Sequence, residues 1–198
     1  MAGVNALSRP RFPFLTVLLV LTAGMLYLDP DSNRLFIYDR GKIFDGELWR
    51  LFTGHLVHLS REHFTYNVLL FSLSGGWVEY RASTQYYWLL SVTAFASSLY
   101  FLFFLPDMAY FAGLSGLISA NVVFLLLLEI QRNRNNTRPF WIVALVLLVA
   151  KIVYEIVAGK ALFIPQNAMA FEVVPSAHII GAVVAAALFV WETPHSGG

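Results

Sequence analysis

Six long apolar segments constrain this 198-residue chain more than any other feature of its sequence. A bilayer core of about 30 Å is crossed by a helix of about 20 mostly apolar residues. Segments of this kind lie near residues 12–28, 63–80, 86–105, 113–130, 140–158 and 177–191. We therefore predict an all-α, polytopic membrane protein with six transmembrane helices, folded as a single membrane domain over residues 1–198.

The composition agrees with burial in lipid. Hydrophobic residues make up 58% of the chain and charged residues 13%, whereas soluble domains are about 45–50% apolar and about 25% charged. The net charge of +1 provides no basic surface, so we expect the lipid bilayer and not nucleic acid as a partner. The chain has no cysteine, which excludes disulfides, thiolate metal sites and a cysteine nucleophile.

The first apolar segment follows Arg9 and Arg11 and has the length of a signal peptide. A secretory signal ends in a small-residue cleavage site, and the sequence Leu28-Asp29-Pro30 does not fit one. We therefore expect this segment to be a retained anchor.

The orientation is predicted from the positive charges of the short loops, because cytoplasmic loops are enriched in lysine and arginine. If the N-terminus is cytoplasmic, the outer short loops, 106–112 and 159–176, contain only Lys160 as a basic residue. The inner side then contains Arg9, Arg11, Arg81, Arg132, Arg134 and Arg138. We expect both termini to be cytoplasmic.

The segment 29–62 between the first two helices mixes charged residues with aromatic and aliphatic ones, Trp49 among them. Tryptophan, tyrosine and an amphipathic rhythm are typical of chain that lies in the membrane interface. We therefore expect this first loop to be associated with the membrane rather than to be a plain linker.

Four polar residues from three helices are predicted to meet at one depth. His63 and Asn67 lie one turn apart where the second helix enters from the outside, Ser115 lies in the first turn of the fourth helix, and His178 lies near the outer end of the sixth. Polar residues inside a membrane are costly and usually mark function.

The chemistry of this set is that of acyl transfer. An imidazole, here His178, can take the proton of a serine hydroxyl such as that of Ser115. The side chains of His63 and Asn67, with the Ser115 amide at the positive end of a helix, are candidate donors to an oxyanion. No acidic residue is well placed in the sequence to orient His178, so we expect a dyad rather than a triad.

Other interpretations of these residues stay open at this point. Gly113 and Gly116 flank Ser115, and small residues of this kind also serve close helix packing in lipid, so Ser115 could be a packing serine. His178 could equally be structural or a proton carrier.

Lys151 and Glu155 are four residues apart and are expected to form an intramembrane ion pair. The alternative is that they bind a charged end of a substrate.

His55, His58 and His63 lie close together in the sequence, as the ligands of a metal site often do. Apart from Glu62, no carboxylate or cysteine completes a ligand set. We expect no metal and no other cofactor.

These residues carry a resemblance to the rhomboid intramembrane serine proteases, in their minimal six-helix form and over nearly the whole chain. The matching elements are Trp49-Arg50, His63-x-x-x-Asn67, Gly75-Gly76-x-Val78-Glu79-x-Arg81, Gly113-Leu114-Ser115-Gly116 and Ala177-His178-x-x-Gly181. The resemblance implies that Ser115 is the nucleophile, that His178 is the general base, and that His63 and Asn67 form the oxyanion site with the Ser115 amide.

The resemblance also implies roles for residues around this set. Gly113 and Gly116 let the oxyanion and the sixth helix approach the backbone. Structural roles fall to Trp49 and Arg50, which anchor the first loop in the outer leaflet, and to Glu79, Arg81 and Gly181. The family often has a second glycine four residues after Gly181, where this chain has Ala185. We expect a slightly wider helix crossing there, and no loss of activity.

Longer motifs resemble the rhombosortase branch of bacterial rhomboids. They are Gly46-Glu-Leu-Trp-Arg-Leu-Phe-Thr-Gly-His-Leu-Val-His58, Tyr110-Phe-Ala-Gly-Leu-Ser115 and Lys151-Ile-Val-Tyr-Glu155. This likeness implies substrates with C-terminal Gly-Gly-type sorting tails, anchored in the bacterial inner membrane and cleaved near its periplasmic face.

Three other functions compete with this one. A general housekeeping rhomboid protease would act on other transmembrane proteins. A non-catalytic rhomboid-like protein would bind membrane helices, but such proteins typically lack the serine or the histidine. A small transporter using histidine and glutamate as proton relays would need polar groups through the full depth of the membrane, whereas here they gather on one side.

Overall fold

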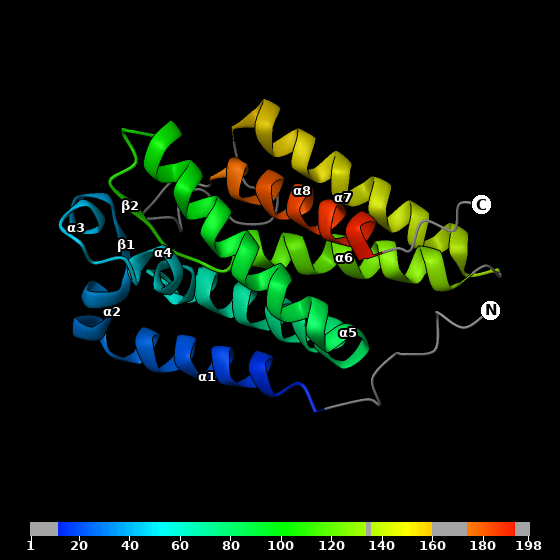
Figure 1. Cartoon of the computed structure of the whole chain (residues 1–198), viewed down its shortest axis with the longest axis horizontal. Coiled ribbons are helices and arrows are strands. Elements are labelled where there is room, and N and C mark those ends of the chain that lie inside the picture. Colours follow the sequence, from blue (N-terminus) through cyan, green and yellow to red (C-terminus); the bar gives the residue numbers. More distant parts are fainter. Residues whose placement is uncertain (1–11, 134–135, 160–173, 193–198) are drawn as a thin grey trace.

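The computed structural model of the protein describes residues 12–133, 136–159 and 174–192. Long helices lie side by side, and the short elements gather at one end of them (Figure 1). In chain order the elements are α1 (Phe14–Leu28), α2 (Pro30–Phe36), β1 (Tyr38–Asp39), α3 (Arg40–Phe44), α4 (Arg50–Thr53), the 3-10 helix η1 (Gly54–Leu56), α5 (Arg61–Phe104), β2 (Tyr110–Phe111), α6 (Ser115–Arg132), α7 (Arg138–Ala158) and α8 (Pro175–Glu192).

Each of the six predicted segments coincides with helix. By length and composition, α5, α6 and α7 can each cross a membrane, with mean hydropathies of 1.5, 1.3 and 2.4. The apolar helix α8 is shorter, and α1 forms a pair with α2 that is bent by 118°. If the bent pair is one span, the described residues contain up to four spans by this measure, so the count of six stays a prediction.

The second and third predicted helices are joined within α5. A straight helix of its 44 residues would be about 66 Å long at about 1.5 Å per residue, which is roughly twice the hydrocarbon thickness of a bilayer. Ala82 has non-helical backbone angles, φ −153° and ψ 58°, and there the chain doubles back on itself (Figure 1). The loop expected between residues 80 and 86 is therefore reduced to a break in one long helix.

The two short strands are a departure from the all-α expectation. Tyr38 pairs with Phe111 and Asp39 with Tyr110, in antiparallel orientation. Each strand has two residues, too few to leave a periodic signal in the sequence. The pair ties the segment after α2 to the chain that leads into α6.

The segment 29–62 is folded around a buried arginine. The Arg50 guanidinium, 4% exposed, donates to the carbonyl oxygens of Arg34 (3.0 Å) and Ile37 (2.7 Å) and pairs with Glu47 at 2.6 Å. The Trp49 ring is half-exposed and donates to the Leu35 carbonyl at 3.3 Å. Its placement in the membrane interface stays a prediction.

The two helices α6 and α8 cross with their backbones in contact. A Cβ atom on Gly181 would collide with the Gly116 carbonyl oxygen and would lie 3.0 Å from the Ala120 nitrogen. A Cβ atom on Gly116 would lie 3.1 Å from the Ala177 carbonyl oxygen. Small residues allow this approach, which is the usual way helices associate in lipid.

The start of α1 is held by a carboxylate of α5. Glu79 is 2% exposed and accepts from the backbone amides of Leu15 and Thr16, both at 2.8 Å, and from the Thr16 hydroxyl at 2.7 Å. The first amides of a helix lack partners within the helix, and the negative charge also favours its positive end. Nearby, Arg81 pairs with Glu129 of α6 at 3.4 Å.

We predict that Glu79→Ala destabilises the protein by about 2–4 kcal/mol, because it leaves the backbone amides of Leu15 and Thr16 without their acceptor, while the Thr16 hydroxyl keeps Tyr86 as a partner. Reversible unfolding in mixed detergent micelles measures the change. Glu62→Ala is the control, because Glu62 is an exposed glutamate in the first turn of α5, and it should cost at most about 1 kcal/mol. Equal losses in the two variants would contradict the role given to Glu79.

Candidate active site

The helices α5, α6 and α8 all begin at the same end of the bundle, beside the short elements (Figure 1). His63 lies in the first turn of α5, where its amide donates to the N-cap hydroxyl of Ser60 at 3.2 Å. Ser115 is the first residue of α6, and His178 is in the first turn of α8. The shared end brings together residues that are far apart in the sequence.

Gly113 is the point at which α5 meets the chain before α6. Its φ of +121° is a conformation that residues with a side chain rarely adopt. A Cβ atom there would lie 2.6 Å from His63 Nε2 and 3.3 Å from Asn67 Nδ2. Both side chains therefore lie against the backbone two residues before Ser115, which only glycine permits.

Ser115 lies at the start of α6 and is partly exposed, in contrast to its buried neighbours Leu114 and Gly116. The first amides of a helix have no partner within it and carry the positive end of its dipole. The hydroxyl is thus placed beside backbone donors suited to a negative oxygen.

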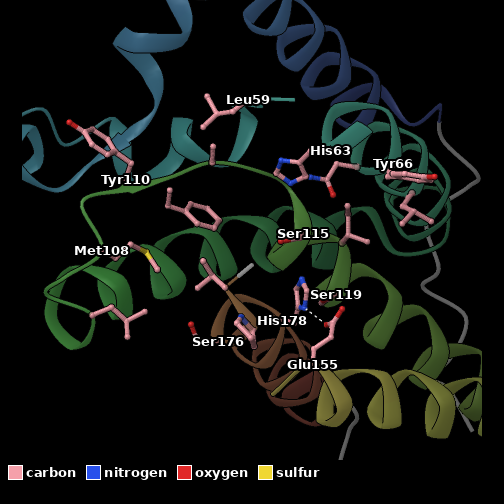
Figure 2. A pocket seen from close by; sticks show the side chains of 18 of the residues that line it. Leu59, His63, Tyr66, Met108, Tyr110, Ser115, Ser119, Glu155, Ser176 and His178 are labelled. Atoms are coloured by element: carbon pink, nitrogen blue, oxygen red, sulfur yellow. Dashed lines mark hydrogen bonds and ion pairs between the residues drawn. The ribbon is translucent and has the colours of Figure 1, made fainter. Parts of the chain in front are cut away.

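One cavity of about 1370 Å³ contains the four predicted polar residues Ser115, His178, His63 and Asn67. Most of its lining is apolar and comes from α5, α6, α7, α8 and the chain around β2. Figure 2 shows the His178 imidazole between Ser115 and the Glu155 carboxylate. The cavity is large enough for an extended peptide segment.

Glu155 of α7 lies against the predicted base. Its Oε2 is 2.9 Å from His178 Nδ1, and the two residues are 1% and 5% exposed. The expectation that no acidic residue is placed to orient His178 is therefore wrong. The sequence could not reveal this contact, because the two residues belong to different helices and the rotation of α7 about its axis decides which face meets α8.

The predicted ion pair of α7 is present as well. Lys151 Nζ lies 2.8 Å from Glu155 Oε2, the oxygen that also contacts His178. The alternative that both residues serve only a charged substrate end does not account for this contact. Lys151 nevertheless lines the cavity, with its side chain 22% exposed.

His58 has a partner that the sequence did not suggest. Its Nδ1 lies 3.1 Å from the Leu56 carbonyl oxygen, so this nitrogen carries the proton and donates. Its Nε2 then accepts from Asn67 Nδ2 at 3.2 Å. One of the two amide protons of Asn67 is thus bound, which fixes the direction of the other.

Comparison with known proteins identifies the family of this chain. The profile named Rhomboid domain matches residues 45–193, a range that contains every residue of the site described in this subsection. The chain belongs to the rhomboid family. A relative in Haemophilus influenzae, "Rhomboid protease GlpG", is 32% identical over 102 residues, which are 52% of this chain and 53% of the relative. This rhomboid chain therefore spans about half the length of the curated relative it matches.

The buried His55 of this rhomboid lies in η1. Among the residues that the structure describes, no three histidine, cysteine or carboxylate side chains lie close enough to hold a metal ion. His55 instead donates through Nε2 to the Ala94 carbonyl at 3.1 Å, with the Ser98 hydroxyl at 3.2 Å. It fastens η1 to the second half of α5.

Burial keeps two of these histidines neutral. It lowers the pKa of His58 to about 3, with a smaller contribution from the neighbouring His63. It lowers the pKa of His55 to about 4. The unfolded chain takes up a proton on each near its ordinary pKa of about 6.5, whereas the folded chain does not. This rhomboid should therefore lose stability as the pH falls below that value.

We predict that lowering the pH from about 7.5 to about 5.5 costs about 1.4 kcal/mol of unfolding free energy for each of these two histidines. His58→Asn keeps a hydrogen-bonding side chain that does not titrate, so its pH-dependent loss should be smaller than that of the wild type by about this amount. Unfolding in detergent micelles at both pH values measures it. The same pH dependence in both proteins would contradict neutral burial of His58.

Proposed function

We propose that this rhomboid is an intramembrane serine endopeptidase in which Ser115 is the nucleophile and His178 the general base. The observation that carries the proposal is the joint placement of the four polar residues around one cavity, within the first two turns of three helices. A packing serine would need no histidine in the same cavity. A proton relay would need polar groups along the whole depth of the bundle.

The proposed reaction is peptide hydrolysis through an acyl-enzyme. His178 takes the proton of Ser115 as the hydroxyl oxygen attacks the scissile carbonyl, and it then gives that proton to the leaving amine. The amides at the start of α6, with His63 and Asn67, stabilise the oxyanion. Water then attacks the acyl-enzyme with His178 again as base, which releases the new carboxylate and restores Ser115.

The proposed substrates are membrane-anchored proteins. A helix shields its own amides through internal hydrogen bonds, so a substrate segment must unwind before Ser115 can attack it. Residues that form helices poorly, such as glycine, ease this step. The cavity supports the proposal because it extends from Ser115 along the chain around β2, over the residues Met108 and Tyr110 (Figure 2).

The proposed setting is the bacterial inner membrane, crossed six times, with both termini in the cytoplasm and the cavity toward the periplasm. The excess of arginine in the loops on the inner side supports this orientation. The end of the bundle that carries Ser115 also carries the segment 29–62, whose exposed Leu48, Trp49 and Phe52 suit an outer membrane interface.

Within the family, we assign the chain to rhomboids that process C-terminal Gly-Gly-type sorting tails. The motifs that resemble the rhombosortase branch include Tyr110, Ser115, Lys151 and Glu155, and all four line the cavity. Sequence motifs shared at a substrate cavity are better indicators of substrate class than motifs elsewhere in the fold. A housekeeping protease with other transmembrane substrates is the alternative.

We predict that a serine-reactive fluorophosphonate labels the reconstituted wild-type protein and does not label Ser115→Ala. His178→Ala should lose labelling as well, because the hydroxyl then has no base. Asn67→Ala should fold and turn over substrate about 10–1000-fold more slowly, because one oxyanion donor is removed. Labelling that survives in Ser115→Ala would refute the assignment. Loss of folding in Asn67→Ala would assign that residue to packing instead.

The substrate class has its own test. We predict that a Gly-Gly-tailed protein of the same cell loses its C-terminal tail when the wild-type enzyme is present. It should keep the tail when the enzyme is deleted or replaced by Ser115→Ala. Mass spectrometry of the C-terminal peptide measures the difference. An identical mature C-terminus in all three strains would leave the protease assignment intact and would exclude these tails as substrates.

A further inference from the structure

Glu155 is a buried carboxylate on a helix that is otherwise turned outward. Among the described residues of α7, only Ile152 and Glu155 are buried. Placing a charged group within apolar surroundings is costly unless it is paired. Glu155 nevertheless lies on the buried face of α7. Its carboxylate contacts two partners there, Lys151 and His178.

The contact with His178 sets the state of the imidazole. An ionised carboxylate only accepts hydrogen bonds, so His178 Nδ1, 2.9 Å from Glu155 Oε2, must carry a proton. In a neutral ring this leaves the lone pair on Nε2. The ring lies between Glu155 and Ser115 in Figure 2, and all three residues line one cavity. The nitrogen without a proton is thus the one available to the serine.

We infer that Glu155 is a positioning residue, which holds His178 in the tautomer and orientation of a serine base. This rests on the proposed function and changes its mechanism from a dyad to a Ser115–His178–Glu155 triad, in which Glu155 acts through His178. When Ser115 attacks, its proton moves to His178 Nε2, and the negative carboxylate stabilises the imidazolium. That proton then leaves with the amine. Glu155 stays ionised throughout and neither gains nor loses a proton.

Lys151 has a different part in this arrangement. Its ammonium contacts the same carboxylate oxygen at 2.8 Å and is partly exposed to the cavity. The positive charge adds to the stabilisation of the ionised carboxylate, which keeps its hydrogen bond from His178 Nδ1 when Lys151 is replaced. A purely structural Lys151–Glu155 pair would not need the histidine, so the two interpretations differ in what they predict for variants of each partner.

The test follows inactivation by a fluorophosphonate probe in the full-length, reconstituted protein. In Glu155→Gln we expect the maximal inactivation rate to fall about 10²–10⁴-fold, because an amide does not fix the tautomer. The concentration of probe at half-maximal rate should stay within about threefold, because the probe contacts Ser115 and not Glu155. Lys151→Met, which removes the ion pair and keeps the carboxylate beside His178, should lose no more than about tenfold.

Glu155→Asp is the rescue variant, because it keeps a carboxylate on a side chain shorter by one methylene. Its inactivation rate should be at least about tenfold above that of His178→Ala, and this comparison decides the matter if Glu155→Gln fails to fold. An aspartate variant as slow as His178→Ala would overturn the inference. Glu155→Gln reacting within about threefold of the wild type, or Lys151→Met losing as much as Glu155→Gln, would overturn it too.

The failure of this inference is distinguishable from failure of the proposed function. If Ser115→Ala is still labelled, the serine assignment is wrong, and the role inferred for Glu155 is wrong with it. If Ser115→Ala is silent and Glu155→Gln reacts normally, the protein is a serine hydrolase that works with a dyad, and Glu155 belongs to the ion pair alone.

Discussion

The backbone contact between α6 and α8 is the constraint on which the rest of the site depends. Ser115 and His178 are the sequence neighbours of Gly116 and Ala177, whose backbones touch. A side chain at Gly181 would hold the two helices apart, and the proposed nucleophile and its proposed base would separate with them. The contact is made entirely by small residues, which give close approach and little else. The close spacing of α6 and α8, and with it the placement of Ser115 and His178, therefore depends on the absence of larger side chains at these positions.

Three buried charged groups of this fold each have several partners, which stabilise them within apolar surroundings. The Glu79 carboxylate caps α1, and the Arg50 guanidinium donates to carbonyl oxygens of the first loop. The Glu155 carboxylate contacts both Lys151 and His178. Each would be expensive alone in a medium of low polarity. Each also joins segments that are distant in the chain. The interactions with these partners offset the cost of burying the charge.

The helical part of the fold and the core of the site could be predicted from the sequence, because they depend on features that are local in the chain. Apolar length locates the helices, and alternation of direction places Ser115, His178, His63 and Asn67 at one end. Glu155 and His58 could not be assigned in this way. The contact of Glu155 depends on the rotation of α7, and that of His58 depends on the path of an irregular segment before α5. The strands β1 and β2 are too short to leave a pattern.

The outward character of α7 has a consequence for the proposed role of Glu155. In the most apolar stretch of α7, 11% of the residues are buried, against 67% in the corresponding stretch of α6. Helix α7 is therefore the more weakly held of the two. The carboxylate that faces His178 is carried by this helix. Any sideways movement of α7 away from α8 would withdraw that carboxylate and leave the imidazole free to turn. The proposed mechanism therefore requires α7 to be packed against α8 when the serine attacks.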